Sequence, residues 1–435
     1  MNPSYIKFSL MKIINSMQDN VSYFVQKPGK DFTRNRICTF SSLILCILSM
    51  ESHRLNTEIR NYFSKVNSQI PTKSAFVQQR DKLNENAFPF ILHSLNRAFP
   101  FKKKYKGYHL IACDGSDINI PPSKVDSLTR VRSNTVGSDY HQFHVNALYD
   151  ILEERYVDVY PQPRSEFDER EAFLSFVRQN PIRGKCLYLA DRGYFSLNVV
   201  ATLQILDAAF LFRVNSIENI RSFFGRFSLP DDEEFDIQLN FKTTRSRRKE
   251  YAEHPDKYVY IRPDRKFEFI PVEDKKSLFT ISFRFVKVKL SDDSYEYLIT
   301  NLPEKSFDIQ ELKKLYNLRW GIETSFRFLK YNIGLNYFHS VKRTLIIQEI
   351  YARIIMYNFT MLLVHCVKVE KKNTKYEYKV SVSDAIDTSR TFLIERLKNG
   401  TIKENLLKYL TPIKPGRSFE RKIRSKRFVS MYNRV

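Results

Sequence analysis

Hydrophobic positions near the start of the chain recur at intervals of three and four, which is the spacing of amphipathic helices. The pattern is clearest at residues 40–48 and 88–99, and Pro71 separates two such runs. Residues 1–105 are therefore predicted to form an N-terminal helical region.

From residue 107 onward, apolar residues form short runs or alternate with polar ones, which is typical of strands. One apolar run ends at Asp114 and another ends at Asp191, and an alternating segment between them turns at residues 150–154. The resulting order is strand, hairpin, helix, strand, helix, strand. This order predicts an α/β fold with a mixed sheet and helices on its faces over residues 106–215.

Strand-like runs dominate residues 216–304, which we interpret as a β-rich insertion that carries the basic cluster TTRSRRK. A long helix is predicted to follow it. Asp308 can serve as the N-cap of this helix, with Glu311 three residues later completing a capping box. Gly334 lies just beyond the expected end of the helix.

A second amphipathic helix is predicted at residues 345–367, so that residues 305–368 would complete the α/β core. The remaining residues, 369–435, are expected to form a helical and basic region. Its final part, residues 411–435, holds eight basic residues against one acid.

The charge of the chain narrows the choice of partners. Lys and Arg total 71 and Asp and Glu total 48, which gives a formal net charge of +23. On a globular composition, this charge indicates a polyanionic partner, most often nucleic acid, although a generally basic proteome gives the same balance. Only 11 glycines are present and neither glycine-rich nucleotide motif occurs, so no nucleotide cofactor is expected.

The five scattered cysteines include no C-x-x-C pair, which argues against a disulfide framework and a zinc ribbon. No apolar run approaches the length of about 20 residues that is needed to span a bilayer. We therefore expect a cytoplasmic protein without a membrane segment.

Several basic residues are candidates for contacting DNA. A predicted helix after Pro71 carries basic side chains beside glutamines, residue types that read bases in a major groove, although an ordinary solvated helix has the same composition. Arg213 lies in an otherwise apolar strand and needs an anionic partner there. The other candidates, from the predicted helix and the insertion, are Lys73, Arg80, Arg245, Arg247 and Arg248.

The segment KKLYNLRWGIETSFRFLK places a set of chemically active side chains on one helical stripe. Because each residue turns the helix by about 100°, the residues on this stripe are Tyr316, Arg319, Glu323 and Lys330. A neighbouring stripe, formed by Leu318, Ile322 and Leu329, is expected to anchor the helix on the sheet. Surface ion pairs would explain the charges, but they do not explain the tyrosine and Trp320 on the same ridge.

Asp114 and Asp191 each end an apolar strand and are followed by a turn, and ligands collect at such strand ends in an open sheet. Two strand-end aspartates and the helical Glu323 can hold two Mg²⁺ ions, because this metal favours carboxylates and water. Two such ions can activate an attacking oxygen and stabilise a leaving one in phosphodiester chemistry. An aspartate before a glycine is commonly only a turn, so the signal lies in the whole constellation.

These residues resemble a known family. The spacing Y-x₂-R-x₃-E-x₆-K, from Tyr316 to Lys330, is similar to the YREK signature of bacterial insertion-sequence transposases of the IS-four group, within the DDE superfamily. The D-G-S at Asp114 and the A-D-R-G-Y-F-S at Asp191 resemble the other two catalytic boxes of that group. The resemblance covers residues 107–340 with specific motifs.

The resemblance implies a ribonuclease H-like fold interrupted by the insertion. It implies that Asp114, Asp191 and Glu323 are catalytic and bind two Mg²⁺ ions, for which Mn²⁺ can substitute. It also implies that the reaction uses water and then a 3′-hydroxyl to cut the element's ends and join them to target DNA. The residues that it places on the DNA are Tyr316, Arg319 and Lys330, to which we add Trp320 and Arg213.

The partners implied by the resemblance are the two transposon ends, the target DNA and a second subunit in the complex that pairs the ends. The implied location is the bacterial cytoplasm, on the nucleoid. Some relatives place a flipped base on an aromatic residue of the insertion; the only tryptophan here is Trp320, on the catalytic helix, so a tyrosine or phenylalanine would take that role.

Two other functions fit the same residues. One is a metal-dependent DNA nuclease or resolvase that cuts without strand transfer. The other is a catalytically silent DNA-binding protein derived from a transposase. The intact set of carboxylates argues against the silent protein, because unused carboxylates gathered at one point would repel one another.

Overall fold

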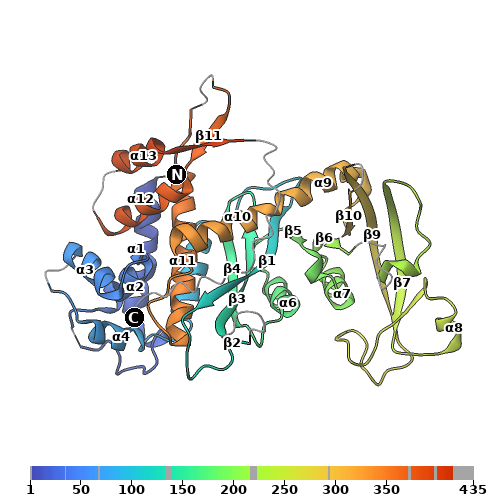
Figure 1. Ribbon diagram of the computed structural model, residues 1–435, viewed down its shortest axis with the longest axis horizontal. Helices are drawn as coiled ribbons and strands as arrows, with labels where there is room; N and C mark the ends of the chain where they lie inside the picture. The colour runs from blue at the N-terminus through green and yellow to red at the C-terminus, as the bar shows by residue number, and fades with distance from the viewer. Residues whose placement is uncertain are drawn as a thin grey trace.

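A mixed sheet of 10 strands runs through the middle of the molecule, with helices packed on its faces and a group of helices at one end (Figure 1). The computed structural model describes residues 2–34, 36–66, 69–132, 139–215, 223–291, 294–370, 374–395 and 399–414. The basic tail that the sequence analysis singled out lies almost entirely outside the described residues. In the described ranges, no helix is long and apolar enough to cross a membrane.

The centre of the sheet has three antiparallel strands followed by two parallel ones. Its strand order is β4-β3-β1-β5-β6, and β1 pairs antiparallel with β3 but parallel with β5. The hairpin between β3 and β4 turns at residues 151–154, as the alternation predicted. The bounds are β1 His109–Ile120, β2 Arg130–Val131, β3 Tyr140–Asp150, β4 Arg155–Pro163, β5 Cys186–Ala190 and β6 Ala209–Val214.

Helices connect the parallel strands because a parallel pair needs a long crossover. Helix α6 (Glu169–Gln179) links β4 to β5, and α7 (Leu197–Ile205) links β5 to β6. Asp168 and Ser196 cap these two helices by accepting backbone hydrogen bonds. The predicted fold class, a ribonuclease H-like mixed sheet with flanking helices and an N-terminal helical region, is confirmed.

The strands after residue 223 extend the same sheet, because β10 pairs antiparallel with β6 and β9 then pairs with β10. The buried Arg284 of β9 forms an ion pair with Asp236 of β7 and donates to two backbone carbonyls. The bounds are β7 Phe235–Thr244, α8 Lys249–Ala252, β8 Tyr258–Tyr260, β9 Leu278–Ser291 and β10 Ser294–Thr300.

Helix α11 (Arg343–Val364) packs between the N-terminal helices and the sheet, where it contacts α2, α5 and β4 (Figure 1). The sequence predicted an amphipathic helix here, but α11 is buried on almost every side because the N-terminal helices cover its second face. The remaining bounds at this end are α1 Pro3–Asp19, α2 Phe40–Ser49, α3 Leu55–Val66, α4 Lys73–Arg80, α5 Ala87–Ala98, α12 Val382–Ile394, α13 Asn399–Lys408, β11 Glu377–Val380 and β12 Leu410–Ile413. The short 3₁₀ turns are η1 Val21–Tyr23, η2 Arg192–Tyr194, η3 Phe223–Arg226 and η4 Glu304–Ser306.

Arg80 corrects one expectation from the sequence. It was a candidate DNA contact, but its side chain is 0% exposed and its Nη1 lies 3.0 Å from Glu349 Oε1 on α11. It also donates to Gln348 and to the carbonyl of Leu345. Arg80 is therefore an interior ion-pair residue that fastens α4 to α11 and has no surface to offer to DNA. Lys73, at the start of the same helix, is half-buried.

Replacing Arg80 with alanine should lower the free energy of unfolding by about 3–5 kcal/mol, because Glu349 would keep a buried charge without this cation. Urea denaturation followed by circular dichroism measures the change. The double replacement Arg80→Met with Glu349→Met should cost less than either single replacement. A single Arg80→Ala variant as stable as the wild type would contradict the assignment of this ion pair.

Candidate active site

The pairing of β1 with β5 brings the two aspartates together. Asp114 does not end its strand as predicted, because β1 continues to Ile120, whereas Asp191 directly follows the last residue of β5. Cys113 lies opposite Ala190 in this parallel register, so the next residues, Asp114 and Asp191, occupy neighbouring positions. Adjacent strands are separated by about 4.8 Å, which sets the spacing of the two backbones. Asp191 also caps the short turn η2, since its Oδ1 accepts from the backbone nitrogen of Arg192 at 2.7 Å.

The predicted long helix is present as three consecutive segments, α9 (Ile309–Leu318), α10 (Trp320–Phe328) and a π-helical turn, η5 (Leu329–Ile333). Asp308 is the N-cap, as predicted, and its Oδ1 accepts from the backbone nitrogen of Glu311 at 2.8 Å. The Glu311 carboxylate, however, pairs with Lys106 at 2.7 Å instead of completing the predicted capping box. Gly334 ends the helix in the left-handed region at φ 89°, a conformation that glycine adopts without strain.

The prediction that Leu318, Ile322 and Leu329 anchor the helix on the sheet is correct for two of the three residues. Ile322 and Leu329 are 0% exposed, but Leu318 is 42% exposed and so does not pack on the sheet. The hydroxyl groups of Ser325 and Tyr156 on β4 lie 2.7 Å apart and add a polar contact to the interface. The charged stripe of the helix consequently faces Asp114 on β1.

Arg319 links Glu323 on α10 to Asp114 on β1. Its Nη2 donates to Glu323 Oε1 at 2.7 Å, and its Nη1 lies 3.7 Å from Asp114 Oδ2. The side chain is only 3% exposed. Burial favours its neutral form, but Tyr316 and the two carboxylates outweigh that effect and raise the pKa of Arg319 above its ordinary value. One buried cation is thus shared by two of the predicted catalytic carboxylates.

Asp114 lies in a setting that disfavours its own negative charge. Burial raises the pKa of this carboxyl to about 6; Arg319 opposes the shift, whereas Glu323 and Glu169 add to it. Several acids therefore share one poorly solvated region, where a bound cation would stabilise the ionised carboxylates.

Three donor atoms at the site have no hydrogen-bond partner although they are buried: the hydroxyl of Tyr316 and the Nε and Nη1 atoms of Arg319. Burying such groups without a partner costs free energy, so the site is suited to an anionic ligand that would accept from them. Lys330 Nζ donates to the backbone carbonyl of Asp117 at 2.8 Å. Burial lowers the pKa of Lys330, which Asp117 and Asp114 partly oppose.

Glu169 and His144 are site residues that the sequence analysis missed. Glu169, in the first turn of α6, lies with its Oε1 3.0 Å from His144 Nε2, and the other ring nitrogen of His144 is 2.7 Å from Asp117. Burial lowers the pKa of His144, but hydrogen bonds to both carboxylates outweigh this effect and raise it.

Two glycines are the sequence signal that could have revealed this contact. A Cβ atom on Gly115 would lie 2.1 Å from His144 Nε2 and 2.9 Å from Glu169 Oε1, and one on Gly193 would lie 3.3 Å from Glu169 Oε2. Because Gly115 and Gly193 have no side chains, the side chain of Glu169 can lie beside both aspartates. The sequence predicts a turn after each aspartate, but Gly115 lies within β1, where it pairs with Asn146.

The donor set fits a magnesium centre in its chemistry, since it consists of carboxylates at one sheet edge with buried donors beside them. Within the described residues, however, no group of three or more His, Cys, Asp or Glu side chains is close enough to hold a metal ion. Glu323 is instead hydrogen-bonded to Arg319.

Arg213 and Trp320 lie beside this cluster. Arg213 Nε is 3.4 Å from Glu296 on β10, and the charges of Arg213, Glu296 and Asp191 all act on Tyr316. Trp320 is 47% exposed, and the Arg319 guanidinium is 6.0 Å from its ring centre. The anionic partner that the sequence required for Arg213 is thus Glu296.

The basic cluster of the insertion divides into structural and exposed residues. Arg245 is 3% exposed and donates to several backbone carbonyls, among them Arg262 at 2.5 Å, so it holds the loop together and has almost no surface for DNA. Arg247 and Arg248 are exposed; Arg247 lies over the Tyr260 ring and Arg248 is 3.5 Å from Glu250. The structure does not bring these three residues to the carboxylate cluster.

Comparisons with known proteins support a single family. Residues 105–359 match a family described as the transposase DDE domain, which covers more than half of the chain. A cryo-EM structure of a piggyBac transposase synaptic complex with hairpin DNA is similar at a TM-score of 0.48 and 10% sequence identity, covering 96% of this chain and 87% of that chain. No curated protein sequence matches the chain.

Replacing Gly115 with alanine should destabilise the protein by about 1–3 kcal/mol, because the new methyl group overlaps the His144 ring. Thermal unfolding measures the loss. Gly225→Ala is the matched control, since a Cβ atom at Gly225 meets nothing within 4 Å. Adding His144→Ala to the Gly115→Ala variant should recover part of the stability; no recovery would show that the ring is not the obstacle.

Proposed function

The chain belongs to the family of transposase DDE domains, and on that premise we propose that it cuts the ends of an insertion sequence and joins them to target DNA. The observation that carries the proposal is that Arg319 links Glu323 to Asp114 beside Asp191, where the parallel pairing of β1 with β5 ends. This edge of an open α/β sheet is where ligands bind. The YREK spacing from Tyr316 to Lys330 supports membership of the IS-four group.

Asp114, Asp191 and Glu323 are the catalytic carboxylates of this proposal and hold two Mg²⁺ ions, for which Mn²⁺ can substitute. When bound, the ions activate the attacking oxygen and stabilise the leaving one. The chain contributes a poorly solvated edge on which acidic groups already crowd one another, which favours cation binding. Glu169 lies beside Gly115 and Gly193 and adds negative charge to that edge of the sheet.

Arg319, Tyr316 and Lys330 bind the phosphates beside the scissile bond. The Nε and Nη1 atoms of Arg319 and the hydroxyl of Tyr316 make no hydrogen bond within the described protein, and they are donors that phosphate oxygens satisfy. Arg213 and Trp320 border the cluster and contact the same DNA strand. The carboxylates keep Arg319 charged, so it is prepared to receive an anion without reorganisation.

The reaction consists of two phosphodiester exchanges at one site. A water molecule attacks the phosphodiester bond at the element's end, and the bond to the 3′-oxygen breaks to leave a 3′-hydroxyl. That hydroxyl attacks a phosphodiester bond of the target, whose own 3′-oxygen leaves. Because the two ends must be paired before joining, the active complex contains at least two subunits.

The five-part division of the chain gives each part a role in this proposal. Residues 106–215 and 305–368 carry the catalytic core, and residues 216–304 form the insertion, whose exposed Arg247 and Arg248 are proposed DNA contacts. Residues 1–105 bind the terminal repeats, with Lys73 as a candidate contact. Residues 369–435 supply further basic side chains.

The replacements Asp114→Asn, Asp191→Asn and Glu323→Gln should each reduce Mg²⁺-dependent cleavage of labelled element ends by about 10²–10³-fold, since several kcal/mol of transition-state stabilisation are lost. Binding of the ends, measured by gel shift, should remain. The exposed Glu250→Gln is the matched control. Wild-type nicking without joining would favour a nuclease, and tight binding without any cleavage would favour a silent DNA-binding protein.

Lys330→Ala should weaken end binding and reduce the slope of log affinity against log salt by about 1, because one phosphate contact is lost. Fluorescence anisotropy over a salt series measures the slope. Lys305→Ala, an exposed replacement in η4 outside the cluster, should leave the slope unchanged. An unchanged slope for Lys330→Ala would remove this residue from the DNA contacts.

A further inference from the structure

A second basic site lies in the N-terminal region, apart from the catalytic cluster. The loop after η1 and the segment after α4 enclose a surface cavity of about 340 Å³. Four of its lining residues are cations, and no carboxylate lines it; the cations are Lys30, Arg34, Arg36 and Lys82. Lys82 belongs to the basic run after Pro71 that the sequence marks as a possible DNA-reading helix, whereas the other three cations lie about fifty positions earlier and are not candidates there.

The cavity is held in shape by contacts on both sides. The backbone nitrogen of Gln26 donates to the carbonyl of Lys82 at 2.7 Å, which fastens the start of the loop to the segment after α4. Phe32, in the left-handed region at φ 57°, packs edge-on against Phe40 of α2. Lys82 Nζ lies 5.6 Å from the centre of the Phe32 ring and donates to Gln79 at 3.1 Å.

The charges in this cavity are not balanced by the protein. Asp31 is the acid of the loop, but it is 8% exposed and accepts from the backbone nitrogen of Lys27. Among the described residues, none of the four cations has a carboxylate within ion-pair distance. Elsewhere at this end of the molecule, Lys342 and Lys65 do have such partners. Like charges around one hollow repel one another unless an anion is bound.

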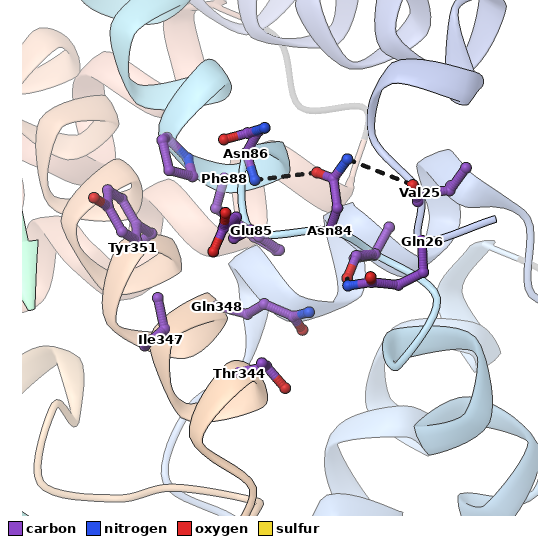
Figure 2. Close-up of a pocket in the computed structure, with 12 residues that line it drawn as sticks. Val25, Gln26, Asn84, Glu85, Asn86, Phe88, Thr344, Ile347, Gln348 and Tyr351 are labelled. Atoms are coloured by element: carbon purple, nitrogen blue, oxygen red, sulfur yellow. Dashed lines mark hydrogen bonds between the residues drawn. The ribbon is translucent and has the colours of Figure 1, made fainter. Parts of the chain in front are cut away.

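The neighbouring cavity has a different lining, so the cluster of cations is a feature of the basic cavity alone among these two. Figure 2 shows that cavity, of about 480 Å³, where the N-terminal segment faces α11. Its polar lining consists mainly of amides such as Gln26 and Asn84, and it also includes the acid Glu85. The basic cavity therefore offers a phosphate four cations, whereas this cavity offers it amides and an acid.

We propose that the basic cavity formed by Lys30, Arg34, Arg36 and Lys82 binds backbone phosphates of duplex DNA. The inference rests on the proposed function and assigns the N-terminal DNA contact to this cavity instead of to the buried Arg80. Arginine forks and lysine ammonium groups are the usual phosphate donors of proteins. Four cations dominate the polar lining, and its one amide, Gln79, is 5% exposed and accepts from Lys82, so the cavity holds DNA without selecting a sequence.

The test removes two charges from the cavity with Arg34→Gln and Arg36→Gln. The probe is a short duplex of arbitrary sequence, and anisotropy is measured over a salt series. The slope of log affinity against log salt should fall by about 2, since each phosphate contact contributes about 0.9. Affinity should fall equally for duplexes of different sequence. The matched control, Lys12→Gln with Lys403→Gln, removes two exposed charges that do not line the cavity.

Three outcomes overturn the proposal. The first is an unchanged slope in a cavity variant whose circular dichroism and thermal unfolding match the wild type. The second is an equal loss in the control variant. The third is unchanged duplex binding while stabilisation by inorganic phosphate, seen as a thermal shift of the wild type, is lost; the cavity would then hold a small phosphate. If the wild type fails to cut element ends but the cavity variant still loses duplex affinity, the proposed function fails and this site stands.

Discussion

The parallel pairing of β1 with β5 is the constraint on which the site depends. It places Asp114 and Asp191 at neighbouring positions although 77 residues of sequence separate them. Every other side chain of the site is positioned against this pair. The helix that carries Arg319 reaches it because its apolar face is buried on the same sheet, and α6 reaches it because the crossover between β4 and β5 must return along the face of the sheet.

Burial gives this cluster its chemistry as well as its geometry. Burial raises the pKa of Asp114, and neighbouring acids add to that shift. Burial also opposes the charge of Arg319, but Tyr316 and the nearby carboxylates outweigh this effect and keep its pKa high. The close approach of Glu169 and His144 is possible only because Gly115 has no side chain. The glycine in the D-G-S motif is therefore a packing requirement inside β1 and not a turn residue.

The +23 charge serves two physical purposes in this fold. Some cations are interior fasteners: Arg80 fastens α4 to α11, Arg245 binds the carbonyls of its own loop, and Arg284 joins β9 to β7. Other cations face outward without a carboxylate partner, and they gather around one hollow of the N-terminal region. Net charge alone cannot separate these two groups, because a buried ion pair and a solvated side chain contribute equally to the sum.

The sequence by itself determined most of the helices and strands and the charged stripe from Tyr316 to Lys330. Hydrophobic periodicity and the cap at Asp308 located the helix, and the fixed turn of a helix placed Arg319 beside Glu323, since these are local properties of the chain. Tertiary structure alone decided the rest. Packing buried Arg80, exposed Leu318, brought Glu169 beside Asp114 and Asp191, and assembled the basic cavity. Each of these outcomes depends on segments that meet only when the chain packs. No local pattern in the sequence encodes which surfaces will face one another.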